Sequence, residues 1–219
     1  MSKARNDCVR AMPSSCGDTG ATTAEIWLVR HASHSALGEV LTGRAACPGL
    51  SELGFAEAAA LARRLQGTNV ARIEASPRLR TRQTAAVIAD ALQLAVDVVP
   101  ALDEVDFGLW NGARFADLAS DPAWQRWNAV RSTEGPPRGE AITDVRRRVL
   151  GHLLASAQSN VGLTVMVTHA EIIRTVLLAA KGLGADDWAQ ITVMPASLTR
   201  VTVAAGNVSL ASMPSELVA

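Results

Sequence analysis

The feature that most constrains this fold is a short apolar run at residues 26–29 that ends abruptly in Arg30 and His31. A run of this kind, stopped by polar residues, is typical of a buried strand. A second run at residues 163–168 is followed in the same way by His169. Because ligands bind beyond the carboxyl ends of strands in open α/β sheets, both histidines are predicted to lie where ligands bind.

Predicted strands and helices alternate along the rest of the chain. Strands are predicted at residues 70–75, 96–99 and 163–168, and a closing hairpin at 198–203 and 207–212. Helices are predicted at residues 51–65, 115–119, 122–130, 141–159 and 171–181. Ser76 is predicted to cap one more helix, with Pro77 in its first turn. This alternation predicts an α/β fold with a mostly parallel sheet.

The composition of the 219 residues fits one globular domain, since 48% of them are hydrophobic and can bury a substantial core. The formal net charge is zero, which argues against nucleic acid as a partner. No apolar stretch reaches the roughly 20 residues that span a bilayer, so no membrane partner is expected. Residues 1–23 lack periodicity and are predicted to be a flexible leader before a domain at residues 24–219.

The three cysteines, Cys8, Cys16 and Cys47, are odd in number and lack CxxC spacing. This usage favours reduced thiols over disulfides. A cytoplasmic protein is therefore expected.

Arginines cluster at residues 76–85, where a helix is predicted to follow the second strand. Cations at a helix N-terminus are unfavourable for the helix itself, because that end of the helix dipole prefers anions. A bound phosphate makes the arrangement favourable, since backbone N–H groups and guanidinium groups both donate to it. Arg30 and Arg80, together with His31 and His169, therefore predict a pocket for a tetrahedral dianion.

The same residue types predict chemistry at phosphorus. His31 is the candidate nucleophile, and the neighbouring groups would stabilise charge on the phosphoryl oxygens. An alkoxide leaving group needs a proton, and Glu104, in the loop after the third strand, is the candidate acid and later the base for water. Asp103 and Asp106 lie in the same loop and are the alternatives for this role.

Five segments between residues 25 and 203 together resemble the histidine phosphatase superfamily, also called the phosphoglycerate mutase-like superfamily. In family order they are Leu28-Val29-Arg30-His31-Ala32, the helix start at 76–85, the acid loop at 102–112, Gly139-Glu140, and 167–174 around His169. The resemblance implies one domain folded as a three-layer α/β/α sandwich of the phosphoglycerate mutase-like type.

The resemblance also implies roles for individual residues. His31 is implied to be phosphorylated in a covalent intermediate. Arg30, Arg80 and His169 are implied to form its phosphate pocket, with Glu104 as the proton donor. The family needs no metal, and no cofactor is expected.

Two positions depart from the family pattern. Family members commonly have an asparagine that contacts phosphate a few residues after the nucleophile, whereas residues 32–37 here read Ala-Ser-His-Ser-Ala-Leu. Ser33, His34 and Ser35 are the candidate replacements. Asn111 stands in the acid loop where glutamate is usual. These departures bear on the choice of substrate more than on the chemistry.

The sequence thus predicts a phosphomonoesterase that acts on a small phosphorylated metabolite without metal. One alternative is phosphoglycerate mutase-type phosphoryl transfer, which usually goes with a longer insertion than residues 113–138 provide. Another is a non-catalytic phosphate-binding protein on the same fold. The sequence neither predicts nor excludes a homodimer.

Specificity is predicted to lie in residues 33–49 and 110–139. His34, Thr42 and Arg44 of the first segment are candidate substrate-binding residues. Arg44 and Arg138 are candidates for binding a second anionic group of the substrate. The tryptophans of the second segment, Trp127 among them, are candidates for covering an apolar or ring-shaped leaving group.

Overall fold

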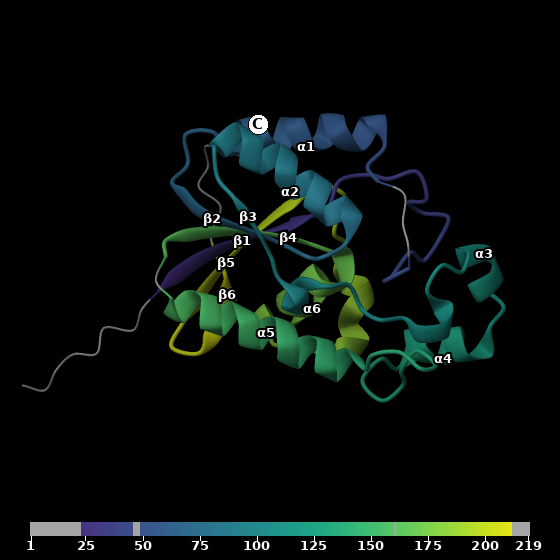
Figure 1. Cartoon of the computed structure of the whole chain (residues 1–219). Helices are drawn as coiled ribbons and strands as arrows, with labels where there is room; N and C mark the ends of the chain where they lie inside the picture. The colour runs from purple at the N-terminus through teal and green to yellow at the C-terminus, as the bar shows by residue number, and fades with distance from the viewer. Residues whose placement is uncertain (1–22, 46–48, 160, 212–219) are drawn as a thin grey trace, which may run out of the picture.

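A computed structural model describes residues 23–45, 49–159 and 161–211, and a six-stranded sheet of order β3-β2-β4-β1-β5-β6 lies at its centre (Figure 1). The strands are β1 (Ala24–Arg30), β2 (Val70–Ala75), β3 (Val96–Val98), β4 (Leu163–Thr168), β5 (Leu198–Ala204) and β6 (Asn207–Leu210). Strands β3, β2, β4 and β1 are parallel to one another, and β5 and β6 add an antiparallel hairpin. The predicted mostly parallel sheet is confirmed.

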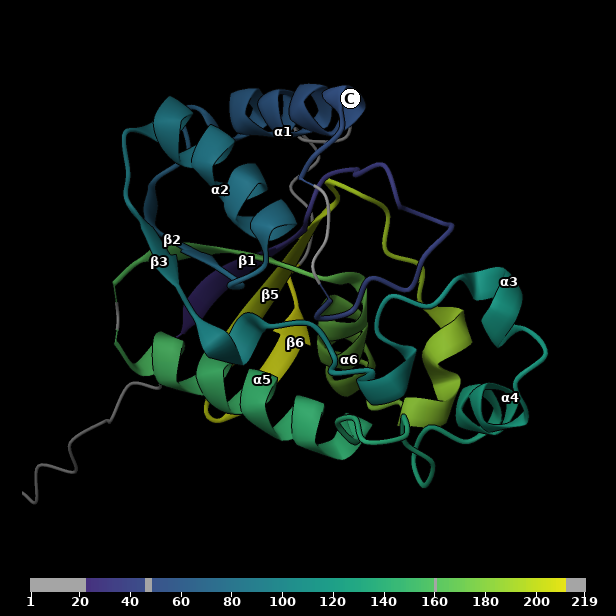
Figure 2. The same cartoon turned by 45° about the vertical axis from the view of Figure 1, so that its right-hand side comes forward.

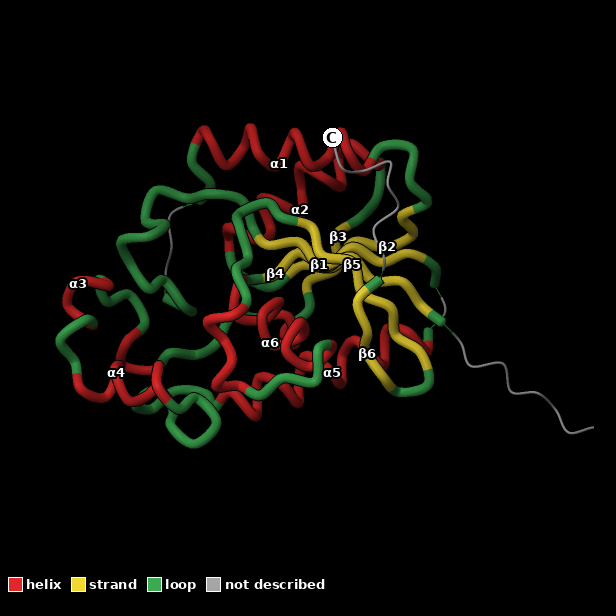
Figure 3. The backbone as a smooth tube through the Cα atoms, turned by 180° about the vertical axis from the view of Figure 1, so that it is seen from behind, coloured by secondary structure: helices red, strands yellow, loops and turns green. Residues whose placement is uncertain are grey.

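Helices cover both faces of the sheet. Helices α1 (Glu52–Leu65) and α2 (Leu79–Leu92) pack on one face, and α5 (Ile142–Gln158) and α6 (Ala170–Ala180) on the other (Figures 1 and 3). Two short helices, α3 (Phe115–Leu118) and α4 (Pro122–Ala129), stand to one side of these layers (Figure 2). Three 3-10 turns complete the elements: η1 (Pro100–Leu102), η2 (Gly108–Trp110) and η3 (Ala185–Gln190). The three-layer sandwich is confirmed.

Strand β1 shows why the sequence forms three layers. Successive side chains of a strand point to opposite faces of the sheet. Ile26 and Leu28 therefore join the core under α5 and α6, whereas Trp27 and Val29 join the core under α1 and α2. All four side chains are buried, which explains why the run is apolar throughout instead of alternating.

The register of the central strands places the site. Arg30 at the end of β1 pairs with Thr168 at the end of the parallel neighbour β4. The backbone N–H of His31 then donates to the carbonyl oxygen of Thr168 at 2.9 Å, and that of Ser76, after β2, donates to Val167 at 3.0 Å. The residues that follow three parallel strands thus leave the sheet at one edge.

One predicted helix start is wrong. Helix α2 begins at Leu79 with Arg78 as its N-cap, and no side chain caps it. Ser76, the predicted cap, lies before the helix, and its hydroxyl accepts from the N–H of Arg78 at 3.4 Å and contacts His169 and Asp103. The serine therefore joins the start of the helix to the site.

Some predictions fall on residues outside the described ranges. The predicted leader at residues 1–23 lies outside them except for Thr23, and so do Cys8, Cys16 and Cys47. Among the helices that the structure describes, none combines the length and the apolar character needed to cross a bilayer.

Candidate active site

A cavity of about 580 Å³ opens at the edge of the sheet where β1 ends, a size typical of small-ligand sites. Of the predicted site residues, five line it: Arg30, His31, His34, Thr42 and Glu104. Arg80 and His169 lie immediately behind this lining and are completely buried. Arg44 does not line the cavity.

His31 is held as a neutral ring with one free nitrogen. Its Nδ1 lies 2.9 Å from the carbonyl oxygen of Ala32. Because a carbonyl only accepts, Nδ1 carries the proton and Nε2 keeps its lone pair. Burial, and then the charge of Arg80, lower the pKa of His31 well below its ordinary value. The imidazole is therefore neutral at physiological pH, as a nucleophile must be.

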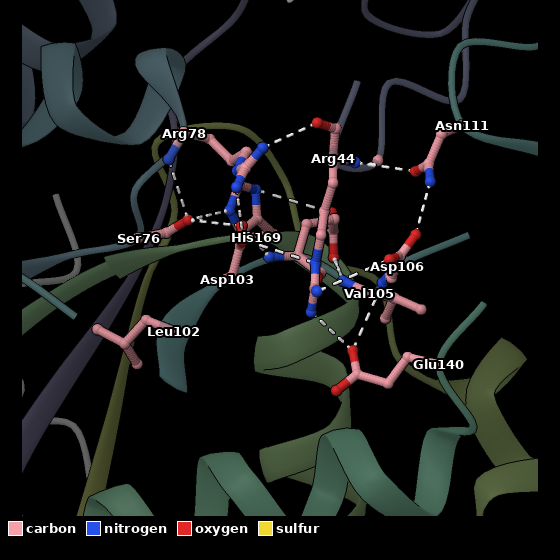
Figure 4. A network of polar contacts seen from close by, with 12 residues as sticks. Arg44, Ser76, Arg78, Leu102, Asp103, Val105, Asp106, Asn111, Glu140 and His169 are labelled. Atoms are coloured by element: carbon pink, nitrogen blue, oxygen red, sulfur yellow. Dashed lines mark hydrogen bonds and ion pairs between the residues drawn. The ribbon is translucent and has the colours of Figure 1, made fainter. Parts of the chain in front are cut away.

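The ring of His169 packs edge-on against His31, with 5.4 Å between the ring centroids. Nη2 of Arg80 lies 3.0 Å from Nδ1 of His169, and a guanidinium can only donate, so Nδ1 accepts. Nε2–H then donates to Oγ of Ser76 at 2.7 Å, and the Ser76 hydroxyl donates to Oδ1 of Asp103 at 3.3 Å (Figure 4). This chain fixes both the orientation and the tautomer of His169.

Arg80 is anchored through a close backbone approach. Its Nη2 also donates to the carbonyl oxygen of Gly43 at 2.9 Å. Gly43 has a φ of 47°, and a Cβ there would collide with the side-chain oxygen of Asn111, so this turn requires glycine. The sequence spacing gives no hint that Gly43 and Arg80 meet.

Several buried nitrogen atoms around His31 have no hydrogen-bond partner among the described residues. They are Nε and Nη1 of Arg80, Nε of Arg30 and Nδ1 of His34. Buried polar groups are rarely left unpaired, and such atoms beside a cavity point to a ligand that completes them. Guanidinium groups suit an anion with several oxygen atoms. Within the described ranges, no group of three or more His, Cys, Asp or Glu side chains is arranged to hold a metal.

Glu104 differs from the other carboxylates of its loop. Burial raises its pKa to about 7, even though the charge of Arg80 acts in the opposite direction. One carboxyl oxygen lies 3.7 Å from Nδ1 of His169. Asp103 instead forms an ion pair with Arg78 at 2.8 Å. The side chain of Asp106 is 38% exposed, and its pKa is lowered, mainly because it accepts a hydrogen bond from the Gly108 N–H. Among the three candidates, Glu104 alone lines the cavity and is poised to exchange a proton near neutral pH.

The loop after His31 has three candidates for the missing phosphate contact, and it presents only His34 to the cavity. Ser33 is tied to α1, because its N–H and hydroxyl donate to Glu57 at 2.8 and 3.0 Å. Neither Ser33 nor Ser35 lines the cavity. The ring of His34 lies 5.4 Å from that of His31, and burial lowers its pKa to about 4. A neutral His34 can donate or accept a hydrogen bond beside His31.

Neither Arg44 nor Arg138, the two candidates for binding a second anionic group of the substrate, lies in the lining of the cavity. Nε of Arg44 donates to the Glu104 carbonyl at 2.8 Å, and its Nη2 pairs with Glu140 at 2.9 Å (Figure 4). Asp103 lies 3.5 Å from the same guanidinium. The acidic residues around the acid loop thus engage Arg44, which holds that loop in place.

Arg131 lies in the segment 110–139 that is predicted to carry specificity, whereas Glu171 and Trp188 are lining residues that the sequence analysis did not indicate. Arg131, just after α4, lies between the rings of Trp127 and Trp188, with its Cζ atom 3.9 and 3.8 Å from their centroids. Its Nη1 pairs with Glu171 of α6 at 2.8 Å. Glu171 stands two residues after His169 in a recognised motif, which is the only signal that could have indicated it. Nothing in the sequence joins Trp188 to Trp127.

A comparison with protein families matches residues 26–215 to the family model described as histidine phosphatase superfamily (branch 1). A curated relative, a bifunctional protein of Mycobacterium tuberculosis, is 37% identical over 141 residues, or 63% of this chain and 39% of its own length. The chain thus spans well under half of that relative. A probable phosphoglycerate mutase of Yersinia pestis is 29% identical over 187 residues, covering 81% of this chain and 84% of its own.

Solved structures share the fold along most of the chain. YhfR of Bacillus stearothermophilus superposes with a TM-score of 0.79 at 25% identity, covering 86% of this chain and 95% of its own. A mycobacterial glucosyl-3-phosphoglycerate phosphatase superposes with a TM-score of 0.70 at 26% identity, covering 82% and 90%. The likeness therefore extends over the sheet and over the helices that flank it.

Proposed function

Because the chain belongs to the histidine phosphatase superfamily, we propose that it hydrolyses small phosphomonoesters through a covalent phosphohistidine on His31. The observation that carries the proposal is the set of buried, unpartnered nitrogen atoms of Arg30, Arg80 and His34 around the free Nε2 of His31. A phosphoryl group there would accept from these donors while its phosphorus faces the nucleophile. Preorganised donors of this kind stabilise the charge that develops in the transition state.

The first step transfers the phosphoryl group to the enzyme. The lone pair of His31 Nε2 forms a bond to phosphorus, and the bond from phosphorus to the ester oxygen breaks. The protonated carboxyl of Glu104 gives its proton to that oxygen, which leaves as an alcohol. Arg30 and Arg80 hold the other phosphoryl oxygens, so their positive charges supply the stabilisation for which other phosphatases use metals.

The second step releases phosphate. The Glu104 carboxylate now takes a proton from a water molecule, whose oxygen forms a bond to phosphorus. The bond from phosphorus to Nε2 breaks, and the electron pair returns to His31. A pKa near 7 suits a group that acts as acid and then as base at neutral pH. No metal takes part, so turnover is expected to persist in excess chelator.

The pH dependence follows from Glu104. Its protonated form is needed for the first step, and this form is lost as pH rises through about 7. We expect kcat/KM for an alkyl phosphate to fall above that pH, with a much weaker fall for an aryl phosphate, whose leaving group needs no proton. Rate profiles between pH 5.5 and 9 check this. If kcat/KM falls above pH 7 by the same factor for both esters, or still falls in Glu104→Gln, then Glu104 is not the group that titrates.

Ser76 is proposed as a positioning residue that acts through His169. Ser76→Ala removes the acceptor of the His169 Nε2–H, so the ring loses one of the two hydrogen bonds that orient it. We expect kcat to fall roughly 10- to 100-fold, with little change in KM. Ser76→Thr keeps a hydroxyl and should recover part of the loss. Ser35→Ala, an exposed serine outside the cavity, is the matched control and should behave as wild type. An equal loss of kcat in Ser76→Ala and Ser35→Ala would exclude a role for Ser76 in positioning His169.

Phosphoglycerate mutase activity is the second candidate, favoured by the likeness to the Yersinia relative. A mutase has to protect its phosphohistidine from water. The measurement is the ratio of phosphoglycerate interconversion to phosphate release, and we expect release to be faster. A non-catalytic phosphate-binding protein is disfavoured, because binding alone has no use for a buried carboxyl with a pKa near 7.

A further inference from the structure

Beyond the phosphate-binding end, the cavity is lined mostly by apolar side chains. They come from the loop after His34, from α3 and α4, and from the segment before β5, and include Leu37, Leu41, Phe115, Trp124, Trp127 and Met194. Phe115 is 37% exposed and Met194 62% exposed, so large apolar groups face the opening. Covering such groups with an apolar ligand is favourable, at about 25 cal/mol for each Å² removed from water.

The aromatic part of this wall is packed before any ligand arrives. The rings of Trp110 and Trp124 meet edge to face, with centroids 5.3 Å apart and planes at 85°. Phe115 packs on Trp124 with 6.2 Å between centroids. Nε1 of Trp110 donates to Asp121, the N-cap of α4, at 3.0 Å. A preformed wall loses little conformational freedom on binding, which favours affinity for a ring or a bulky apolar group.

The charged groups of the same cavity are largely engaged with one another. Both faces of the Arg131 guanidinium are covered by tryptophans, and its terminal nitrogens donate to Glu171 and to Asn128. Arg174 pairs with the same Glu171 and donates Nε to the Ile191 carbonyl at 3.0 Å. Burial by itself would raise the pKa of Glu171, but the two arginines lower it overall. Glu171 is therefore held between two cations, while Nε of Arg131 and Nε1 of Trp127 are buried in the same wall without a hydrogen-bond partner among the described residues.

From this wall we propose that the substrate is a phosphomonoester whose leaving group is aromatic or bulky and apolar. The proposal rests on the proposed function and names its substrate class. It places ring recognition on the α3–α4 insertion.

The test compares esters of primary alcohols, so that the leaving oxygen is similar in each. The substrates are 2-phenylethyl phosphate, glycerol 3-phosphate and 3-phosphoglycerate. We expect kcat/KM for the phenylethyl ester to exceed that for glycerol phosphate by roughly 10-fold or more, from the apolar area that the ring buries. Equal or better turnover of glycerol phosphate or phosphoglycerate would overturn the proposal.

A matched pair of variants locates the effect. Phe115 lines the cavity, whereas Phe55 on α1 is similarly exposed, at 44%, and does not line it. Phe115→Ala should lower kcat/KM for the phenylethyl ester about 5-fold and leave glycerol phosphate within about 2-fold. Phe55→Ala should change neither. Equal losses for both substrates in Phe115→Ala would mean that this ring has only a structural role.

Binding of non-hydrolysable analogues separates this proposal from the proposed function. Calorimetry compares 2-phenylethylphosphonate with 2-hydroxyethylphosphonate. Preferential binding of the phenyl analogue without turnover of any ester would refute the hydrolase while supporting the apolar subsite. Turnover that shows no preference for the phenyl compound, in the kinetic comparison or in calorimetry, would refute the apolar subsite but not the hydrolase.

Discussion

His31→Ala is expected to reduce turnover of a chromogenic phosphate ester by at least ~10⁴-fold, the scale seen when a nucleophile is removed. The residual pocket still holds Arg30 and Arg80, so phosphate binding should survive even though no bond to phosphorus forms. Steady-state rates in the presence of a chelator measure the first effect, and calorimetric titration with inorganic phosphate measures the second.

The control uses the histidine that lies apart from the site. His152 on α5 contacts Glu74 at 2.6 Å, and His152→Gln keeps a hydrogen-bonding side chain there. This variant should retain wild-type rates. Rapid quenching of the wild type with labelled substrate should trap an acid-labile phosphoryl group that His31→Ala lacks. A trapped label of the same amount in His31→Ala would refute the nucleophile.

Glu104→Gln is expected to slow hydrolysis of alkyl phosphates by about 10²- to 10⁴-fold, because the amide has no proton to give to the alkoxide. The loss should shrink for aryl phosphates with acidic phenols, whose oxygens leave without protonation. A plot of log kcat/KM against leaving-group pKa should therefore be steeper for the variant than for the wild type. Parallel lines would show that Glu104 is not the acid.

The same substitution should change stability with a defined sign. Burial raises the pKa of Glu104 from 4.5 to about 7, so the fold favours the neutral carboxyl. That stabilisation is complete below pH 4.5 and is lost as pH rises through about 7. Glu104→Gln does not titrate, so relative to wild type it should gain up to ~3 kcal/mol in unfolding free energy between pH 5 and pH 8.5.

Urea unfolding at the two pH values measures this gain. Glu134→Gln, which replaces an exposed glutamate in the loop after α4, serves as the control and should show the same difference from wild type at both. If the stability difference between Glu104→Gln and wild type is the same at pH 5 and pH 8.5, the carboxyl is not held in its neutral form.

Much of the candidate site could be predicted because it depends on local patterns. The apolar runs before His31 and His169 predict buried strands, and parallel strands bring their carboxyl ends to one edge. Because Arg30 pairs with Thr168 in neighbouring strands, the next residues, His31 and His169, are brought close together. The layers follow as well, since β1 is apolar on both of its faces.

Other features depend on contacts between residues far apart in the sequence. Ser76 is a residue type that is typical of helix N-caps, yet its hydroxyl forms a hydrogen bond with His169, which is 93 positions away. Arg44 resembles a substrate-binding cation, but it is neutralised by carboxylates from the acid loop and Glu140. No periodicity encodes either pairing, because each partner comes from a different loop.

The sequence by itself determined the layered α/β sheet, the strand ends and the identity of the residues gathered there. Strand burial and helix periodicity are local consequences of where apolar side chains stand. Only the tertiary structure decided which carboxylate of the acid loop is buried enough to titrate near neutral pH, and which arginines remain unpaired beside His31. Burial and ion pairing depend on the whole surroundings of a group, so they are fixed only when distant loops pack together.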